Sequence, residues 1–492
     1  MARKRGASAP KGRVVSMPQA RYDAAGQGRR LRGWVAPATG PNRAMQGAET
    51  LRNRARDAAR NDWAATAGAR TWTTNLIGTG IVPRPKTEDA ALKARLRALW
   101  DAWVPWADAD GLLDFYGLQT LAVRSWIVAG EVFIRLRPRR PEDGLAVPLQ
   151  MQLLEADMVP LLDADSYPGL SAGNKIRAGI EFDRIGRRVA YWMYRDHPGD
   201  APRSGLVSSE LVRVPAEWVK HLYEPLRPGQ LRGVSEFSPV LAKLRGVMDY
   251  DDAVLERQKL ANLFTLFITR PNFLPEQLVG AGNSTLTAQQ MIDLYNAPDT
   301  AGLQPGTAHD LLPGEDVRFS NPPDAGSSYG EFMRHQHMGV AAGQGTPYEL
   351  VTGDIRDVSD RTLRVIINEF RRHCEQRQWQ IVIPMLCQPV RDAWADAAWM
   401  AGLLTRVDSD EAKRVHWRPQ AWPYIHPVQD REGKQLDIQM GLRARGAIIN
   451  EAGDDPDEVD AERAEDRARE KRLGLAEPTP RAKQPNQPGE EK

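Results

Sequence analysis

Residues 235–269 read SEFSPVLAKLRGVMDYDDAVLERQKLANLFTLFIT and form the longest uninterrupted helical pattern in the chain. Ser235 to Pro239 provide a helix start signal, and Pro271 ends the pattern. Apolar residues recur on one side at helical spacing, and an acidic cluster lies in the middle. At the usual rise per residue, the pattern predicts a rod of roughly 50 Å.

The segments that follow predict a short excursion and a return. Residues 270–328 consist of short pieces separated by proline and glycine, with a capping box at 287–290 and a turn and strand at 311–319. Residues 329–343 are again helical, and the glycines and proline of 343–347 stop them. We therefore expect two antiparallel helices joined by a small compact unit.

The part of the chain before this pair predicts helices followed by strands. Helical spacing covers 49–74, 87–103 and 115–128, and Gly130 ends the last of these helices. The period then changes to that of strands, at 131–137, 148–154, 175–183, 188–194 and 219–222. Helices that precede a run of strands are typical of the α+β class.

The part after the pair is predominantly helical. Residues 359–402 form a helical pattern, with interruptions expected at Pro384 and Pro389. Aromatic residues and prolines cluster at 415–428, and helices are expected at 435–449 and 457–472. Neither the end nor the beginning of the chain shows any periodicity. Up to Arg60, the chain contains fourteen Lys and Arg residues but only three Asp and Glu residues.

Composition narrows the functional classes. The chain of 492 residues carries 66 basic and 64 acidic side chains, a net charge of +2. A protein that grips nucleic acid tightly would carry a larger basic excess, whereas one that DNA slides past need not. The two cysteines, Cys374 and Cys387, suit neither a disulfide framework nor a zinc knuckle, so we expect a reducing compartment. No apolar run reaches the length of a membrane span.

Motifs for catalysis, cofactors and metals are missing from the sequence. It contains no GxxxxGK[ST], HExxH, GxSxG or CxxC pattern. His335 and His337 are two residues apart on a helix, so their side chains diverge, and a turn with a helix cap explains Asp108, Asp110 and Asp114. We therefore predict no catalytic residue, no cofactor and no metal site, and we expect no enzymatic activity.

Several blocks, in a shared order and spacing, resemble the lambda-type portal proteins of tailed phages. The most specific block is HLYEPLRPGQLRG at 221–233, which is similar to the signature that opens this family's first stem helix. Further blocks are LRNRARDAARN at 51–61 with NLIGTGI at 75–81, GIEFD at 179–183, and PYELVTGD at 347–354. Residues 357–364 depart from the family pattern in their central positions.

The resemblance implies the α+β portal fold. This fold has a helical wing with a β-sheet, an antiparallel helical stem, a small α/β clip and a helical crown. The implied parts are a flexible basic arm (1–48), the wing (49–232), stem helix 1 (233–269), the clip (270–328), stem helix 2 (329–343), a channel loop (344–360), a long wing helix (361–414), the crown (415–473) and a flexible tail (474–492).

The resemblance also implies function and partners. It predicts a ring of subunits, usually twelve, at one capsid vertex of the virion, assembled in the host cytoplasm. Double-stranded DNA would pass through this conduit without sequence recognition during packaging and ejection. The implied protein partners are a terminase motor, the major capsid protein, a scaffold and head-completion proteins, and no membrane is implied. Two alternatives stay open, namely a nuclease-like DNA-processing protein of a mobile element and a scaffolding protein without a channel.

Candidate functional residues follow from these expectations. In the family, the loop after the second stem helix projects into the channel, so the DNA-channel candidates are Gln344, Thr346, Arg356, Asp357 and Arg361. Ring closure requires complementary surfaces on the two sides of a subunit. The stem and assembly candidates are Lys243, Arg245, Asp249, Asp251, Asp252, Glu256, Arg257, Lys259 and Arg364.

Overall fold

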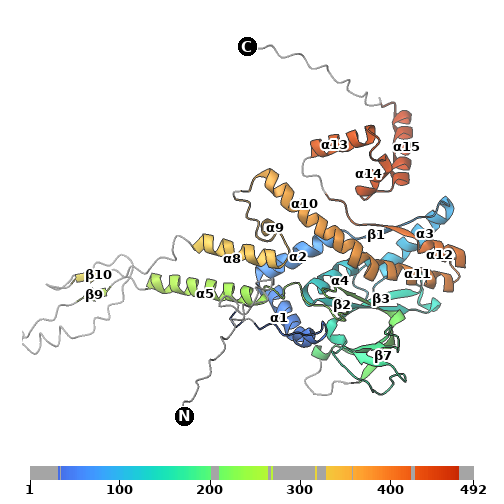
Figure 1. Cartoon of the computed structure of the whole chain (residues 1–492). Coiled ribbons are helices and arrows are strands. Elements are labelled where there is room, and N and C mark those ends of the chain that lie inside the picture. The colour runs from blue at the N-terminus through green and yellow to red at the C-terminus, as the bar shows by residue number, and fades with distance from the viewer. Residues whose placement is uncertain are drawn as a thin grey trace, which may run out of the picture.

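A computed structural model describes residues 32–33, 35–200, 210–263, 267–269, 316–318, 329–356, 358–422 and 427–475 (Figure 1). The capping box predicted at 287–290 lies outside these residues. The structure describes the predicted basic arm (1–48) only at 32–33 and 35–48, and the predicted tail (474–492) only at 474–475. A body of helices and sheets carries two long helices, α5 (Leu241–Leu263) and α8 (Tyr329–Gly343), which project from it side by side (Figure 1). The C-terminal helices, drawn in red, lie on a different side of the body from this pair (Figure 1).

The body begins with two helices where the sequence predicted one. The expected helix at 49–74 is wrong as a single element, since α1 (Ala48–Asn61) ends at Asp62 and α2 (Trp63–Ile77) begins after it. The Asp62 carboxylate accepts hydrogen bonds from the backbone N–H groups of Ala64 and Ala65, at 2.7 and 3.1 Å. An N-cap of this kind satisfies donors that a continuous helix would have bonded internally.

Helix α4 (Phe115–Ala129) leads directly into the central sheet. Gly130 ends α4, as predicted, and it has a left-handed conformation; β2 (Glu131–Pro138) starts at the next residue. β2 lies between β3 (Leu149–Glu155) and β8 (Val219–Tyr223), and both neighbours are antiparallel to it. The sheet packs against α4, and the signature block at 221–233 begins within β8, beside β2.

A second antiparallel sheet has the order β4-β5-β6-β7. The strand predicted at 175–183 is a hairpin of β4 (Lys175–Arg177) and β5 (Ile180–Phe182), because Ala178 and Gly179 both have positive φ and turn the chain. β6 (Arg188–Tyr194) was predicted, and β7 (Leu211–Pro215) was not. This sheet has its own small core around Phe133, Ile180 and Tyr191.

The main core joins segments from the whole chain. Four tryptophans, Trp72, Trp103, Trp126 and Trp394, are its largest fully buried apolar side chains. They come from α2, α3 (Ala90–Trp103), α4 and α11 (Gln388–Met400), so the last of these helices closes a core that the first three build.

The long C-terminal helix runs through the body as three joined segments. α10 (Asp360–Arg377) passes into a π-helical stretch, η9 (Gln378–Cys387), and then into α11. The interruption predicted at Pro384 is thus a widened turn and not a break. Because a π-helix shifts its hydrogen bonds by one residue, it accommodates a proline that lacks the N–H group.

The remaining elements include a long-range strand pair. β1 (Val82–Pro85) pairs with β11 (Val415–Arg418), which ties residues 415–418 to the N-terminal half of the chain. α12 (Arg406–Ala412) precedes β11, and α13 (Pro427–Gln439), α14 (Arg445–Glu451) and α15 (Pro456–Leu473) follow it. The helix predicted at 435–449 is wrong, since it spans the end of α13 and the start of α14.

The first helix of the projecting pair differs from its prediction at both ends. It begins at Leu241 and not at 235, because residues 236–240 form turns at its base, and residues 267–269, which were predicted as its end, form a strand. α8 has the predicted bounds, and β9 (Phe267–Thr269) pairs with β10 (Asp316–Arg318) beyond the two helices. Among the described residues, no helix is both long and apolar enough to cross a membrane.

Candidate channel and assembly surfaces

Two glycines of α8 let the projecting helices approach closely near the body. A Cβ built on Gly343 would overlap Cγ1 of Val240, and one built on Gly339 would overlap the Nζ atom of Lys243. The two glycines are four residues apart, so they lie on the same face of α8. The assembly candidate Lys243 is therefore half-buried against α8 within its own subunit.

Aromatic contacts join the same helices further from the body. The ring centroids of Tyr250 and Phe332 lie 5.0 Å apart, and those of Tyr250 and Tyr329 lie 6.3 Å apart. The Tyr329 hydroxyl donates a hydrogen bond to the carboxylate of the assembly candidate Asp251. This carboxylate raises the pKa of Tyr329 to about 12. Asp251 thus contributes to the contact between α5 and α8.

Most of the other assembly candidates share one exposed stripe of α5. Their spacing of four, three, four and three residues places them on one face, away from α8. Within the stripe, Arg245 and Asp249 form an ion pair of 3.0 Å and Glu256 and Lys259 one of 2.8 Å. We call this face the charged stripe; its members are Arg245, Asp249, Asp252, Glu256 and Lys259. The candidate Arg257 is also exposed but lies off the stripe.

Two of the DNA-channel candidates are buried, which corrects their predicted placement. Gln344 is fully buried and Thr346 is 5% exposed, because the chain turns back under α2 at the end of α8. The N–H of Thr346 donates to the oxygen of Ala341, and Gly345 has a φ of 70°. This is a Schellman turn. Since Trp72 also donates to the oxygen of Gln344, at 2.8 Å, the turn anchors α8 to the core.

The loop after this turn is organised by Asp354. Its carboxylate accepts two hydrogen bonds of 2.8 Å from the guanidinium of the channel candidate Arg356, and one of 3.0 Å from the hydroxyl of Tyr348. Arg334 of α8 lies 3.4 Å from the same carboxylate and donates to the oxygen of Arg356. The hydrogen bonds from Arg356 hold the pKa of Asp354 well below its usual range. The guanidinium of the exposed Arg356 is therefore paired with Asp354 within the same loop.

The remaining candidates separate into different surroundings. Asp357 lies outside the described residues, and Arg361 is exposed in the first turn of α10. Arg364, an assembly candidate, lies 3.6 Å from Asp430 of α13 in the same chain. Arg356 and Arg361 are thus both exposed, whereas Arg364 has an acidic partner within the subunit.

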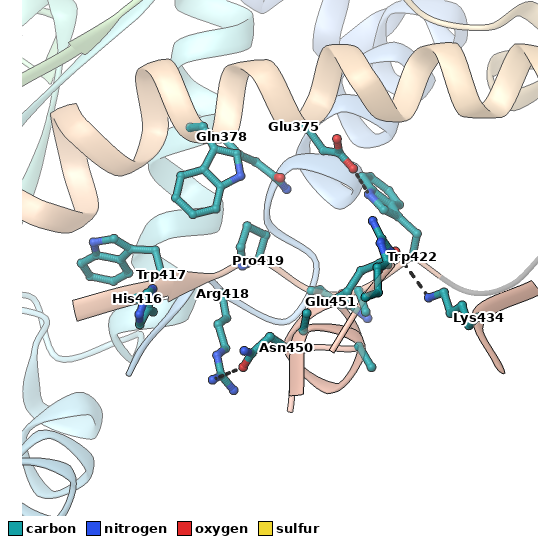
Figure 2. A pocket seen from close by; sticks show the side chains of 16 residues that line it. Glu375, Gln378, His416, Trp417, Arg418, Pro419, Trp422, Lys434, Asn450 and Glu451 are labelled. Atoms are coloured by element: carbon teal, nitrogen blue, oxygen red, sulfur yellow. Dashed lines mark hydrogen bonds and ion pairs between the residues drawn. The ribbon is translucent and has the colours of Figure 1, made fainter. Parts of the chain in front are cut away.

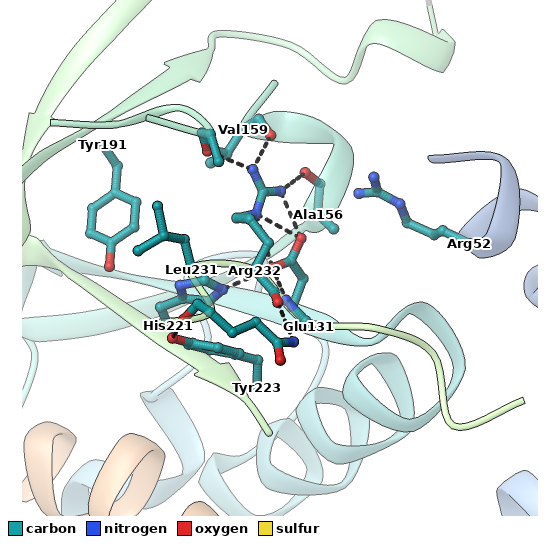
Figure 3. Close-up of polar contacts among 12 residues, drawn as sticks. Arg52, Glu131, Ala156, Val159, Tyr191, His221, Tyr223, Leu231 and Arg232 are labelled. Atoms are coloured by element: carbon teal, nitrogen blue, oxygen red, sulfur yellow. Dashed lines mark hydrogen bonds and ion pairs between the residues drawn. The ribbon is translucent and has the colours of Figure 1, made fainter. Parts of the chain in front are cut away.

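The signature block at 221–233 builds a buried ionic cluster at the base of α5 (Figure 3). Glu131, at the start of β2, forms hydrogen bonds of 2.8 and 2.9 Å with Nε of Arg232 and lies 3.0 Å from Nε2 of His221. All three side chains are almost completely buried. Arg232 also donates to the backbone oxygens of Ala156, Val159 and Ala178, which gives most of its N–H groups an acceptor.

The charge states in this cluster follow from its contacts. Burial alone would raise the pKa of Glu131, but Arg232 and His221 outweigh it and hold that pKa well below its usual range. Burial lowers the pKa of His221 to about 4, so the ring is neutral at physiological pH. A carboxylate and a guanidinium that compensate each other can remain buried and ionised.

Two neighbours complete the connection from β8 to α5. The Tyr223 hydroxyl donates to the oxygen of Gln230 at 2.9 Å, and the Gln230 side chain accepts from the N–H groups of Leu226 and Arg227. Sequence reasoning quoted these residues as a family signature but assigned them no role. The signal for a structural role was the arginine and glycine that stand at fixed spacing before the long helical pattern.

Arg377 joins the long helix to the base of the projecting pair. Its guanidinium forms ion pairs with Glu224 at 2.9 Å and with Glu236 at 2.7 Å. It also lies 4.2 Å from the ring centroid of Trp72 and 5.7 Å from that of Trp126. One side chain thus fixes α10, α2, α4 and the turns before α5 relative to one another.

A pocket of about 800 Å³ lies between α10, the segment after β11, and α14 (Figure 2). Trp379, Trp417 and Trp422 contribute aromatic surface, and Trp422 donates to the carboxylate of Glu375 at 3.3 Å. On the far side, Arg443 pairs with Glu451 at 2.6 Å. The pocket marks the junction between the body and the three C-terminal helices.

One group of side chains has the composition of a metal site. Glu155, Asp157 and His197 place their ligand atoms within 4.8 Å of one another. However, Arg56 already lies 2.8 Å from Glu155 and 2.7 Å from Asp157, so a guanidinium balances both carboxylates. The group is explained as an ion pair that attaches α1 to the sheet.

Comparison with known proteins gives one family. A family model described as "Phage portal protein, lambda family" matches residues 27–378. The probable portal protein of Halomonas phage phiHAP-1 is 27% identical over 457 residues, which are 89% of this chain and 84% of that protein. Portal protein B of Escherichia phage lambda is 21% identical over 322 residues, which are 61% of this chain and 60% of that protein.

Solved structures are similar at a lower level. The neck of a native GTA particle computed with C12 symmetry matches with a TM-score of 0.44 and 13% identity, covering 86% of this chain and 96% of that chain. The virion of a native gene transfer agent particle matches with a TM-score of 0.45 and 14% identity, covering 84% of this chain and 94% of that chain.

Proposed function

Because the chain belongs to the lambda family of phage portal proteins, we propose that its subunits close into a ring through which double-stranded DNA enters and leaves a capsid. The observation that supports this most directly is the projecting pair of α5 and α8. These antiparallel helices extend from the body with most of their surface outside any core, as expected of a segment that packs against neighbouring copies.

In this proposal, α5 and α8 form the stem and the body around the two sheets forms the wing. The clip includes β9 and β10, and the crown contains α13, α14 and α15. β11 pairs with β1 of the wing, so we place the boundary between wing and crown after residue 418 and not before 415. The C-terminal helices have no buried residue of their own, which suits a crown completed by neighbouring crowns.

We assign ring contacts to the charged stripe of α5. It combines Arg245 and Lys259 with three carboxylates and faces away from α8, so it is available to the next subunit. Heterologous contacts of this kind generate closed rings when the rotation per subunit divides a full turn. Twelve copies are the number that the family resemblance suggests.

We assign DNA proximity to the loop that follows α9 (Tyr348–Thr352). Arg356 is exposed in this loop and pairs with Asp354, and Arg361 is exposed in the first turn of α10, which follows the loop. The acidic residues of α5 disfavour phosphate binding, so a small number of arginines can guide a duplex without the strong adhesion that many phosphate contacts produce. Gln344 and Thr346 instead support this loop from within the core.

The proposal also includes location and partners. The ring would occupy one vertex of the capsid in the virion, after assembly in the host cytoplasm. A terminase motor would dock on it during packaging, and the major capsid protein, a scaffold and head-completion proteins would contact it at other stages. These partners rest on the family alone.

Electron microscopy of the purified full chain tests the proposal. We expect rings with a central hole, and a particle mass equal to a whole multiple, expected to be twelve, of the 54.9 kDa chain. Monomers that stay monomeric at high concentration, or open filaments, would contradict it.

Reconstitution with linear DNA and a cognate motor then tests Arg361→Ala, with Arg187→Ala in the exposed turn before β6 as the matched control. We expect lower packaging efficiency with intact rings for the first variant only.

A further inference from the structure

A buried arginine in α11 lacks the acidic partner that such a charge requires. Arg391 is 1% exposed, and its guanidinium lies between Trp394 and Trp100, at 4.1 and 4.6 Å from their ring centroids. Its Nε donates to the oxygen of Ala412 at 2.9 Å. Within the described part of the chain, its Nη1 atom has no hydrogen-bond partner and no ion pair joins Arg391 to a carboxylate.

Two further arginines lie around the same space. Arg84 of β1 and Arg97 of α3 bind Glu458 of α15 through their Nη1 atoms, at 2.7 and 2.5 Å. Their Nε atoms are buried and have no hydrogen-bond partner among the described residues. Arg84, Arg97 and Arg391 line one cavity of about 70 Å³, together with Asp101, Glu458 and the apolar surface of Trp100 and Leu96.

The chemistry of arginine defines what this cavity needs. A guanidinium carries five N–H donors and no acceptor, so a buried unpartnered nitrogen requires an oxygen or an anion. Burial lowers the pKa of Arg391 to about 9, which leaves the side chain protonated at neutral pH. Stacking on two tryptophans compensates only part of the desolvation of such a charge.

We infer that this cavity is a binding site for a small inorganic anion of the halide class, held by Arg391 with Arg84 and Arg97. Among the lining arginines, Arg84 and Arg97 pair with Glu458, and Arg97 also pairs with Asp455, so an anion would compensate the charge of Arg391. A volume of about 70 Å³ is sufficient for a monovalent ion together with a few waters. The inference does not depend on ring formation.

The position of the cavity connects the anion to the C-terminal helices. Glu458 belongs to the first turn of α15, while the other lining residues belong to β1, α3 and α11. Asp455 at the start of α15 pairs with Arg97 and lies 3.7 Å from Lys93. The anion would therefore sit beneath the contact between α15 and the body and stabilise it.

Anomalous diffraction from crystals of the full chain grown in bromide tests the site directly. We expect an anomalous peak inside the cavity beside the Arg391 guanidinium. Density that refines as water, with no anomalous signal in bromide, overturns the inference.

Thermal unfolding gives an independent test in solution. Chloride is replaced by gluconate at constant ionic strength, since gluconate is too large for the cavity. We expect the Tm of the wild-type chain to fall by about 2 °C. In Arg391→Met, which removes the charge but keeps a long apolar side chain, we expect this dependence to disappear. Arg406→Met is the matched control, because Arg406 also lies over a tryptophan, 4.7 Å from the ring centroid of Trp399, but is exposed and does not line the cavity. Equal chloride dependence in both variants overturns the inference.

Discussion

Gly130 and Gly233 cross with their backbones in direct contact: a Cβ built on Gly233 would overlap the carbonyl oxygen of Gly130. The first glycine ends α4 and the second precedes the turns that lead to α5. The crossing brings the N–H of Gly233 to within 2.8 Å of the Glu131 carboxylate, so the backbone contact and the buried cluster depend on each other.

Gly233→Ala should therefore destabilise the body strongly. The neighbouring atoms are backbone and cannot move aside without displacing β2, so we expect a loss of about 2–4 kcal/mol in the free energy of unfolding. Urea unfolding followed by circular dichroism measures it. Gly246→Ala on α5 is the control, since a Cβ there meets open space. It should be neutral or slightly stabilising, and equal losses in the two variants would refute the packing argument.

The neutral state of buried His221 predicts a pH dependence of stability. Its pKa is about 4 in the folded chain and about 6.5 in an unfolded one, so between these values the unfolded chain binds more protons. The free energy of unfolding should consequently fall by about 1–3 kcal/mol as the pH drops from 6.5 to 4. Glu131 adds to this loss only at lower pH, because its folded pKa is depressed and its contribution disappears as the pH falls through that value.

Chemical unfolding at several pH values, compared between wild type and His221→Gln, separates this contribution. The amide can still donate to Glu131 but does not titrate, so the slope between pH 6.5 and 4 should become flatter. His197→Gln removes a more exposed histidine next to Glu155 and should leave the slope unchanged. An unaltered slope in His221→Gln would mean that other groups cause the acid sensitivity.

Gly343→Leu should separate α5 from α8. The added side chain would enter the space that Val240 occupies, whereas Gly330→Leu, at the other end of α8, meets open space. Hydrogen exchange across residues 241–263 is the appropriate measurement, and we expect faster exchange there in the first variant only. Similar protection in both variants would show that the helices tolerate a wider separation.

Contact between α15 and the body should weaken with salt. Lys93 pairs with Asp457 at 2.5 Å and Arg84 with Glu458 at 2.7 Å, and several of these side chains are partly exposed, so counterions screen them. We expect faster proteolytic release of the C-terminal helices at high concentrations of sodium gluconate, whose anion does not fit the cavity beside Arg391, and at any salt concentration in Asp455→Ala, which also loses the N-cap of α15. Asp466→Ala, whose ion pair stays within α15, is the control. Release that is independent of salt in the wild type would contradict the electrostatic explanation.

The sequence predicted the elements whose signals are local. α8 has the predicted bounds, α15 differs from its prediction by one residue at each end, and Gly130 terminates α4 as expected. In each case a helical period ends at a glycine or begins at a cap, so the information lies within a few residues.

Features that depend on distant partners could not be predicted in this way. β1 and β11 pair across more than three hundred residues, and Glu131 and Arg232 meet from positions 101 residues apart. The break at Asp62 was missed because alanines continue the helical pattern on both sides of it. Gln344 and Thr346 have polar side chains beside glycines, which suggests an exposed loop, but the Schellman turn places them under α2.

The widened turns of η9 set the rotation of α11 relative to α10 about the helix axis. Each turn that closes over five residues adds one residue beyond the ordinary repeat and rotates everything after it by about 100°. Trp394 and Arg391 therefore enter the core on a face that α10, extended without interruption, would have turned elsewhere. Pro384 lies within this stretch, and a deletion of one residue between 378 and 387 would turn one widened turn into an ordinary α-helical turn while Trp394 keeps its buried face.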